Sequence, residues 1–469
     1  MGNIRFGTDG WRAIIAKEFT FENLEKVVQA TADVWKRQRV AGTKKKVVIG
    51  YDRRFLSDQF ARRSAEILAG NRFEVSLSDR ALPTPAVSYH VKVGKAIGGI
   101  MITASHNPAH FNGFKIKAHF GGSADAALCQ RVEKRVGCSA VQSTPLETAK
   151  NIRVKDLTRS YLRRLTQLVD FDRIADSRLR FAHDALYGVG AGCFDEILKN
   201  TSCRVTTLRG EVNPGFGGIN PEPIPANYAE STAVLSKRPH DICLVTDGDA
   251  DRIGGMDGRG QPLTTHQMIC LLLRHLVKNR RGKGRVIKAL TTTSMVDKMC
   301  RSYGMPLVET GVGFKYICAE MILGDVLLGF EESGGIGFPG HVPARDGILA
   351  GLMLLEMLAV EKKPLRRLLS ELGKEFGPHR YDRIDVHFPL EKRADLMCFC
   401  AENPPKTLGG SPVERVKTFD GVKFIASNGA WLMLRGSGTE PVLRIYAEAD
   451  SQVNVKKLLQ VGLKLTRRV

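Results

Sequence analysis

The sequence predicts an α/β protein with three α/β units in series and a smaller C-terminal α+β domain, all around a shared cleft. Its 469 residues exceed one ordinary core, since domains of about 100 to 150 residues would make it three or four. A short β-branched run, a Gly-rich or polar turn and an amphipathic helix recur along the chain, which is typical of α/β architecture. The chain after residue 375 departs from this pattern.

The three units follow from the order of these runs. The expected strands are residues 46–50, 96–103, 178–182, 242–245, 285–290 and 326–329. The expected helices are a segment that follows the first strand to Leu68, then residues 194–198 and 295–303, and a long helix after Asp346. The strands 96–103 and 242–245 end directly at Ser105 and Asp247, where the carboxyl ends of strands gather ligands in open α/β sheets.

The C-terminal part is expected to be a small α+β domain. Residues 378–388, 431–434 and 442–447 have strand patterns, and a closing helix follows Gln452. We place the four domains at residues 1–150, 151–257, 258–374 and 375–469.

Composition narrows the class of protein. Apolar residues make up 43% and charged residues 25%, which is a globular composition. The longest nearly uncharged stretch, residues 348–360, is interrupted by Glu356 and is shorter than the roughly 20 residues that span a bilayer. The N-terminus lacks the apolar core of a signal peptide, and the ten cysteines form no CxxC pair. We therefore expect no membrane partner, a cytoplasmic location and reduced thiols.

The net charge of +21 raises nucleic acid as a partner, because clustered Lys and Arg bind phosphates. The basic runs, however, are separate and are not interleaved with aromatic residues that could stack on bases. We interpret them as solvated faces that attract anionic substrates, and we expect no nucleic-acid partner.

The first polar loop, residues 102–108 (ITASHNP), presents Ser105 at a strand end. Asn107 and Pro108 stop the strand from continuing, so the serine hydroxyl lies at the sheet edge. An ordinary turn or helix-cap serine is as common as a nucleophile at such a place. No GxSxG motif surrounds Ser105, which disfavours acyl transfer.

The second loop, residues 246–252 (TDGDADR), carries Asp247, Asp249 and Asp251 at alternate positions. Three acids this close repel one another unless a cation neutralises them. A solvated acidic turn is the alternative, and an EF-hand is excluded because Arg252 and Gly258 stand where it needs Gly and Glu. A hard cation held by few carboxylates, with phosphate oxygens completing its shell, is typical of magnesium.

The third loop, residues 329–335 (GFEESGG), offers Glu331, Glu332 and Ser333, which suit sugar hydroxyls. A glycine-assisted loop without function is the alternative. The nearby glycines satisfy GxGxxG by spacing, but no helix follows at once, so we dismiss a dinucleotide site.

The fourth loop, residues 435–441 (RGSGTEP), lies between two strands. Its glycines can free backbone N–H groups to bind an anion, and three side chains add donors. It is not a Walker loop, and a plain hairpin turn is the alternative. The residues expected to bind phosphate are Arg435, Ser437, Gly438 and Thr439.

Together the four loops make the chain resemble the α-D-phosphohexomutases, the group that contains phosphoglucomutase, phosphomannomutase and phosphoglucosamine mutase. Their TASHNP, DGDADR, EESGG and RGSGTEP segments occur in the family's order, one per domain, and the match runs nearly end to end. The resemblance implies three related mixed-sheet α/β domains and a fourth, smaller α+β domain around a deep cleft.

The resemblance also implies roles for individual residues. Ser105 would be the phosphoserine, whose phosphate completes the magnesium site of Asp247, Asp249 and Asp251. Glu331 and Ser333 would bind sugar hydroxyls, and the fourth loop the phosphate that is not reacting. One departure is Phe330, which stands where the family commonly has Gly. We expect Phe330 to alter the backbone of the third loop or the sugar preference. The basic residues around the phosphoryl group would be Arg12, His106, Lys115 and Arg252, with Lys315 as a further substrate contact.

The implied reaction interconverts hexose 1-phosphate and 6-phosphate through a hexose 1,6-bisphosphate, which serves as activator and intermediate. The third loop is similar to that of glucose-using members, whereas Gln for Glu332 and His for Gly335 would resemble glucosamine-using ones. Mannose phosphates, alone or as a second substrate, remain an alternative. A non-catalytic polyanion-binding protein is the alternative from another class, and the sequence leaves monomer or homodimer open.

Overall fold

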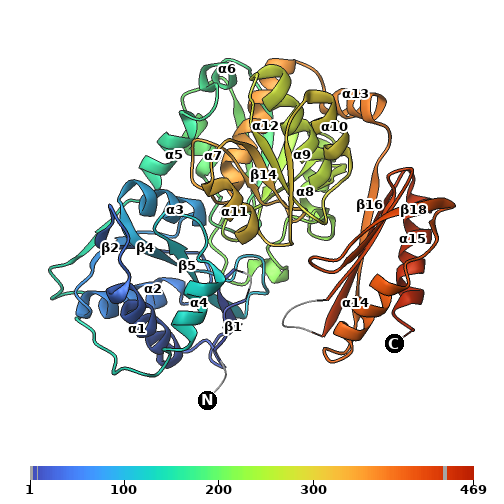
Figure 1. Ribbon diagram of the computed structural model, residues 1–469. Coiled ribbons are helices and arrows are strands. Elements are labelled where there is room, and N and C mark those ends of the chain that lie inside the picture. Colours follow the sequence, from blue (N-terminus) through green and yellow to red (C-terminus); the bar gives the residue numbers. More distant parts are fainter. Residues whose placement is uncertain (1–3, 8, 437–440, 469) are drawn as a thin grey trace.

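The computed structural model describes residues 4–7, 9–436 and 441–468 of the chain. In this part the strands form four sheets, three of them mixed and the last antiparallel, and each sheet lies in its own domain (Figure 1). The smaller fourth domain is connected to the other three by the strand that begins at residue 380. The predicted fold class, three mixed-sheet α/β domains and a C-terminal α+β domain, is confirmed.

The first domain has a six-stranded sheet with helices on both sides. Its strands are β1 (Trp11–Ile14), β2 (Lys44–Tyr51), β3 (Glu74–Ser78), β4 (Ala96–Ile102), β5 (Phe111–Ala118) and β6 (Ile152–Lys155). Its helices are α1 (Phe21–Arg37), α2 (Ser57–Gly70), α3 (Thr84–Val93) and α4 (Ala126–Glu133). A Cβ at Gly98 of β4 would lie 2.5 Å from the Trp35 ring. Glycine there lets α1 lie directly on the central strand.

The second domain is built around a five-stranded sheet. Its strands are β7 (Arg180–Asp184), β8 (Arg204–Leu208), β9 (Ile242–Thr246), β10 (Ile253–Asp257) and β11 (Pro262–Leu263). Its helices are α5 (Thr158–Thr166), α6 (Phe171–Ala175), α7 (Cys193–Leu198) and α8 (Ala229–Lys237).

The third domain has a four-stranded sheet. Its strands are β12 (Arg285–Ala289), β13 (Leu307–Thr310), β14 (Val326–Phe330) and β15 (Ile336–Gly337). Its helices are α9 (Thr265–Arg274), α10 (Met295–Tyr303), α11 (Phe314–Ile322), α12 (Gly347–Glu361) and α13 (Leu365–Phe376). Helix α9 begins at a capping box in which Thr264 and Gln267 satisfy each other's backbone N–H groups.

The three mixed sheets share one arrangement of four strands. The orders are β5-β4-β2-β3, β10-β9-β7-β8 and β15-β14-β12-β13. In each, the second strand pairs in parallel with the third and antiparallel with the first. The loops of Ser105, Asp247 and Glu331 follow β4, β9 and β14, which occupy the same place in their sheets. The polar loops predicted from sequence therefore come from equivalent positions of three related folds.

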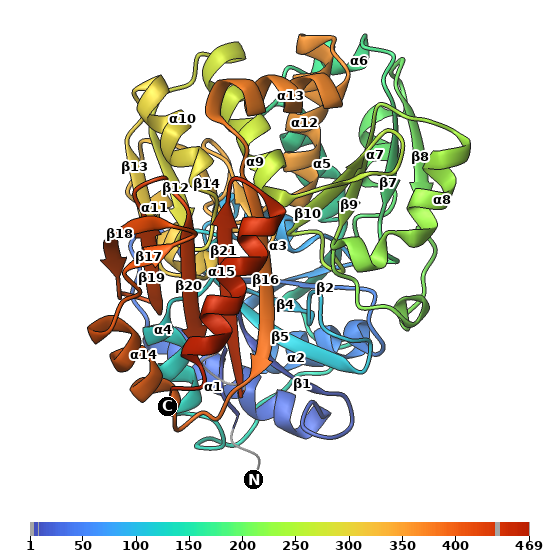
Figure 2. The same ribbon diagram turned by 90° about the vertical axis from the view of Figure 1, so that its right-hand side faces the viewer.

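The fourth domain has its own hydrophobic core under an antiparallel sheet. Figure 2 shows α15 lying across the face of β20 and β21. Trp431 donates its indole N–H to Glu448 at 3.0 Å, and Glu448 also accepts from the backbone N–H of Ser294 in the third domain at 2.8 Å. The elements are β16 (Arg380–His387), α14 (Arg393–Glu402), β17 (Thr407–Leu408), β18 (Ser411–Lys417), β19 (Val422–Ala426), β20 (Trp431–Gly436), β21 (Val442–Ala449) and α15 (Gln452–Leu465).

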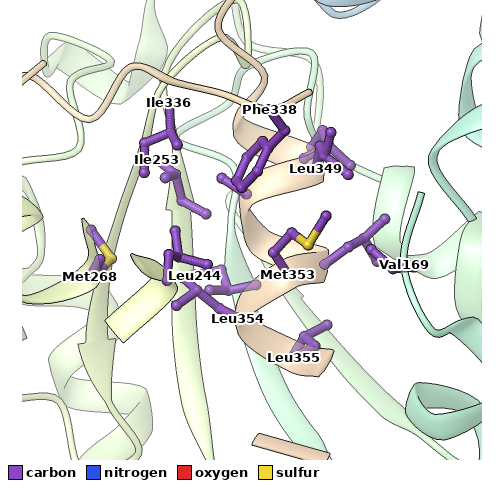
Figure 3. Packing of buried hydrophobic residues seen from close by; sticks show 14 of the residues in the cluster. Val169, Leu244, Ile253, Met268, Ile336, Phe338, Leu349, Met353, Leu354 and Leu355 are labelled. Atoms are coloured by element: carbon purple, nitrogen blue, oxygen red, sulfur yellow. The ribbon is translucent and has the colours of Figure 1, made fainter. Parts of the chain in front are cut away.

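Helix α12 lies inside the protein between the second and third domains. Its residues from Gly347 to Ala359 are all buried. Figure 3 shows Leu349, Met353 and Leu354 packed among side chains of both domains. The one acid in this run, Glu356, accepts from His275 and Arg280 and from a backbone N–H, so its charge is compensated. Among the helices that the structure describes, none is both long and apolar enough to cross a bilayer.

Truncating Leu354 to alanine should destabilise the protein by about 2–5 kcal/mol, because the side chain is fully buried and its removal leaves a cavity. Leu323→Ala is the matched control, since Leu323 is 74% exposed and its loss should cost no more than about 0.5 kcal/mol. Chemical denaturation of both variants measures the difference. Equal stability of the two variants would contradict the burial of α12.

Candidate active site

Ser105 lies in a buried, strained turn directly after β4. Its φ of 54° is in the left-handed region, which residues other than glycine seldom adopt. The Arg54 guanidinium donates to the carbonyls of Ser105 at 2.7 Å, Asn107 at 2.6 Å and Pro108 at 2.7 Å, which holds the turn in place. The Ser105 hydroxyl donates to Oδ2 of Asp247 at 2.7 Å. The loops after β4 and β9 therefore meet at this hydroxyl.

The three aspartates of the second loop converge. Asp247, Asp249 and Asp251 are buried, and each offers a carboxylate oxygen within 4.8 Å of the others. Oδ1 of Asp249 and Oδ1 of Asp251 are buried without a hydrogen-bond partner among the described residues. Buried acceptors of this kind need a partner, and carboxylate oxygens suit a hard divalent cation. The group could therefore hold a metal ion, as its spacing predicts.

The protonation of this group reflects its crowding. Burial, and then the neighbouring carboxylates of Asp249 and Asp251, raise the pKa of Asp247 well above its ordinary value. Burial opposes ionisation of Asp249 too, but the ammonium of Lys115 and the hydrogen bonds that Asp249 accepts lower its pKa. One of those bonds comes from the Thr84 hydroxyl at 2.6 Å. The pKa of Asp247 is therefore raised while that of Asp249 is lowered, so without a cation these two carboxyl groups ionise at different pH.

Lys115 is buried at the centre of the acidic group. Its ammonium lies 2.8 Å from Asp9, 2.8 Å from Asp249 and 3.4 Å from Asp251. Burial lowers the pKa of Lys115, but attraction from these three carboxylates outweighs burial and raises it above its ordinary value. The predicted basic residue is therefore a charged neighbour of the candidate metal group.

Arg345 joins the same group from the third domain. One nitrogen donates to Oε1 of Glu331 at 2.9 Å, and the other lies 2.7 Å from Asp9 and 2.6 Å from Asp251. Its partners come from three domains, and its side chain is 8% exposed. The carboxylates raise the pKa of Arg345 well above its ordinary value, against the opposing effect of burial. Arg345 therefore fixes Glu331 next to the candidate metal group.

The other predicted basic residues surround the Ser105 loop. Arg12, on β1, donates to the side chain of Asn107 at 2.8 Å. Arg252 donates its backbone N–H to Asp247 at 3.1 Å and forms an isolated antiparallel β-bridge with Gly335 of the third loop. Burial, and then the positive charges of Arg252 and Arg12, lower the pKa of His106 well below its ordinary value. The His106 Nδ1 atom is buried without a partner in the described part of the chain.

The third loop follows β14 and turns back into β15. Glu331 is 5% exposed and donates its backbone N–H to Gly335 at 3.0 Å. Oγ of Ser333 is buried without a partner among the described residues, and Glu332 accepts from the Thr291 hydroxyl at 2.5 Å. Phe330 is the last residue of β14 and packs in the hydrophobic core that contains α12.

Lys315, at the start of α11, lines a cavity of about 510 Å³. Asp9 and Lys115 line the same cavity from the first domain. Lys315 therefore shares this cavity with two members of the charged group. Arg435 lies on β20, where its Nε is 3.0 Å from Asp420, and Asp420 also accepts from the backbone N–H of Val312 at 2.6 Å. The other predicted phosphate-binding residues, Ser437, Gly438 and Thr439, are outside the described residues.

Sequence reasoning missed three residues that contact the Ser105 loop or the charged side chains around the three aspartates. Asp9 stands in the GTDGWR segment that was singled out only for Arg12, and Arg54 and Arg345 stand in RRF and ARDG segments that carry no periodic signal. Asp9 and Arg345 are 336 residues apart, so nothing local indicates their contact. A buried ion pair of this kind becomes visible only when the domains are assembled.

Comparison with known proteins identifies the family of the chain. Models of the phosphoglucomutase/phosphomannomutase family match in the order of the domains. The α/β/α domains I, II and III match residues 3–139, 159–260 and 264–376, and the C-terminal domain matches residues 400–461.

Individual relatives match over nearly the whole chain. A phosphoglucomutase/phosphomannomutase of Thermococcus kodakarensis is 27% identical over 99% of this chain and 98% of its own. A phosphoglucosamine/phosphogalactosamine mutase of Sulfurisphaera tokodaii is 30% identical over 99% of both. A crystal structure described as a phosphomannomutase of Thermus thermophilus is 35% identical, covers 99% of both chains and has a TM-score of 0.86. The chain therefore belongs to the phosphoglucomutase/phosphomannomutase family of α-D-phosphohexomutases, and it is an isomerase that transfers phosphoryl groups.

Proposed function

We propose that this protein is a magnesium-dependent phosphohexomutase that interconverts glucose 1-phosphate and glucose 6-phosphate through a phosphoserine at Ser105. The observation that carries this proposal is the hydrogen bond of 2.7 Å from the Ser105 hydroxyl to Asp247, inside a buried group of three aspartates. A serine beside a candidate metal group is suited to phosphoryl transfer, which depends on positioning and on compensation of charge.

In the proposed reaction, the bond between phosphorus and Oγ of phospho-Ser105 breaks while phosphorus bonds to the free hydroxyl oxygen of a hexose monophosphate. The hydroxyl proton passes to a base, for which His106 of the Ser105 loop is suited, because its lowered pKa leaves the imidazole neutral. Lys115 has a raised pKa and stays protonated, so it supplies positive charge. The Ser105 oxygen takes up a proton in turn as it leaves, so the products are hexose 1,6-bisphosphate and free Ser105. After the bisphosphate turns over in the cleft, its other phosphate returns to Ser105, which restores the phosphoserine and releases the isomeric monophosphate.

Asp247, Asp249 and Asp251 would hold magnesium together with an oxygen of the Ser105 phosphate. The bound cation would compensate negative charge on the transferring group. Positive charge around the same turn comes from Lys115, Arg12 and Arg252. Arg54 holds the turn in place by donating to the backbone carbonyls of the turn. Ser333 and Glu331 would bind sugar hydroxyls, because one offers a hydroxyl without a partner in the described structure and the other a carboxylate oxygen.

The fourth domain would bind the phosphate that is not reacting. Arg435 supplies the charge from β20. Backbone N–H groups of the RGSGTEP loop would donate hydrogen bonds to either phosphate, regardless of the sugar carbon that bears it. Asp420 orients Arg435 and connects its strand to the third domain through Val312. Lys315 would contact substrate from the cavity wall that it shares with Asp9.

The sugar is tested by assays on glucose, mannose and glucosamine 1-phosphates, each with magnesium and the matching 1,6-bisphosphate. We expect the highest kcat/KM with glucose 1-phosphate and measurable turnover of mannose 1-phosphate. A higher kcat/KM with mannose 1-phosphate would favour a phosphomannomutase. Turnover of none of the three would favour a polyanion-binding protein, which would bind nucleic acid with a steep salt dependence and would not need Asp247.

A further inference from the structure

We propose that a cavity between α1 and α4 is a second anion-binding site of the protein, and that it takes a small oligophosphate, free or as the phosphate tail of a nucleotide. The cavity has a volume of about 610 Å³, which is within the range of small-molecule sites. Figure 1 shows the two helices side by side in the first domain. The proposed mutase reaction uses none of the residues that line this cavity.

Four cations line the cavity, and none of its lining residues is acidic. Arg131, Lys134 and Arg135 are spaced at i, i+3 and i+4, which places them on one face of α4 and of the turn that extends it. Arg37, the last residue of α1, lines the cavity from the other helix. A cleft lined by charges of one sign raises the local concentration of counter-ions, so this cavity should attract anions.

The four cations are not compensated within the protein. None of them pairs with a carboxylate in the described part of the chain. The acids nearest to them in the two helices have other partners, since Asp33 lies 3.9 Å from Lys36 and Glu133 accepts from the Phe6 backbone N–H at 2.5 Å. Like charges that line one cavity repel one another, and a bound anion would relieve the repulsion.

The basic run at residues 278–285 shows the ordinary alternative, a solvated face with ion pairs. Its Lys278 lies 2.9 Å from Glu375, and its Arg285 lies 2.8 Å from Glu320. Such a run needs no ligand, because the protein itself supplies the negative charge. The cluster between α1 and α4 has no such acids, so an ion-paired surface does not describe it.

The kind and number of the cations indicate phosphate. Three of the four are arginines, whose forked N–H donors match pairs of phosphate oxygens. A phosphoryl group carries about 1.5 to 2 negative charges at pH 7, so about two of them compensate four cations. The ligand class that fits is therefore a diphosphate or a somewhat longer oligophosphate, and not a single phosphate.

Gln38 favours a nucleotide over a free oligophosphate. It lines the same cavity, and its Oε1 atom is buried without a hydrogen-bond partner among the described residues. A buried acceptor needs a donor, which the hydroxyls or an amino group of a nucleoside can supply. Val34, which is also buried, gives the cavity an apolar wall against which such a group can pack.

The test is calorimetric titration of the full-length protein with ADP and with pyrophosphate. Magnesium is left out, so that no metal ion recruits the phosphates to the aspartates. The cluster variant Arg131→Gln/Arg135→Gln removes two charges, and Lys134 is kept because it also lines the cavity of about 510 Å³ described above. Arg159→Gln/Arg163→Gln is the matched control, because both arginines are exposed on α5 at the same spacing and the change of charge is equal.

We expect both ligands to bind the wild type with a Kd of about 1 mM or lower, and both affinities to fall by about tenfold or more in the cluster variant but not in the control. Arg37→Gln should weaken both ligands from the other helix, and Gln38→Leu should weaken ADP only. Equal affinities for ADP and pyrophosphate, unchanged by Gln38→Leu, would still support the site and would identify a free oligophosphate as its ligand.

Three results would overturn the inference. They are no binding by the wild type, binding that the cluster variant leaves unchanged, and an equal loss in the control, which would indicate a general effect of charge. A DNA duplex of about 20 base pairs that loses affinity in the cluster variant, while ADP and pyrophosphate do not bind, would overturn it in favour of a nucleic-acid surface. The cluster variant should keep the thermal unfolding transition and the mutase turnover of the wild type, so a failure of the proposed function is seen separately.

Discussion

Ser105→Ala is expected to lower kcat for glucose phosphate isomerisation by about 10⁴-fold or more, because the variant has no oxygen to carry the phosphoryl group. The loop should keep its shape, since the carbonyl of Ser105 that Arg54 holds belongs to the main chain. Substrate should therefore still bind, and the loss should appear in kcat much more than in KM. A coupled assay for glucose 6-phosphate measures the change.

Intact-protein mass spectrometry after incubation with glucose 1,6-bisphosphate gives a second measurement on the same variant. The wild type should gain one phosphoryl group and Ser105→Ala none. Ser88→Ala is the matched control, because Ser88 is also buried in the first domain and its hydroxyl has no hydrogen-bond partner among the described residues. Near-normal turnover by Ser105→Ala would refute the phosphoserine.

Asp247→Asn should weaken magnesium binding by at least about 100-fold, because it removes the negative charge of a proposed ligand. Even the loss of a residue that only hydrogen-bonds to a metal ligand lowers metal affinity by about 10 to 100-fold. Turnover should fall with it. Thermal and chemical unfolding give a measurement that does not depend on activity. Magnesium at about one hundred times its dissociation constant should stabilise the wild type by about 2.7 kcal/mol, and this gain should fall to about 0.4 kcal/mol or less in the variant.

Without magnesium the same substitution should not destabilise the protein. Asparagine has nearly the shape of aspartate, can accept from the Arg252 backbone N–H with its oxygen and donate to the Ser105 hydroxyl with its amide nitrogen, and relieves repulsion among three crowded acids. Asp176→Asn is the control, because Asp176 is an exposed acid of the second domain. A variant that is still stabilised by magnesium like the wild type would place the ion elsewhere.

Much of the fold follows from local sequence patterns. The strand expected at residues 242–245 is β9, and the helix expected at residues 295–303 is α10. The long helix expected after Asp346 is α12, and Glu356, which interrupts its apolar run, pairs with His275 inside the protein. Periodicity and strand ends are local properties, so they can be read from the chain.

The candidate site was predictable only in part, and the reason is physical. Ser105 and the three aspartates were predicted because each group follows a strand directly, where α/β sheets gather ligands. Their meeting joins the ends of strands in two different sheets, which no local pattern indicates. Arg54 and Arg345 act through contacts between distant segments, and an arginine in a loop is far more often a solvated surface charge.

The position of α12 limits how this chain can be divided or recombined. The hydrophobic cluster around the helix contains Val48 of the first domain, Phe181 of the second and Leu328 of the third. A fragment cut between these domains would expose an apolar helix and would tend to aggregate. The fourth domain has a separate core, so it is the part best suited to exchange in chimaeras between relatives, whereas the first three should be transplanted together.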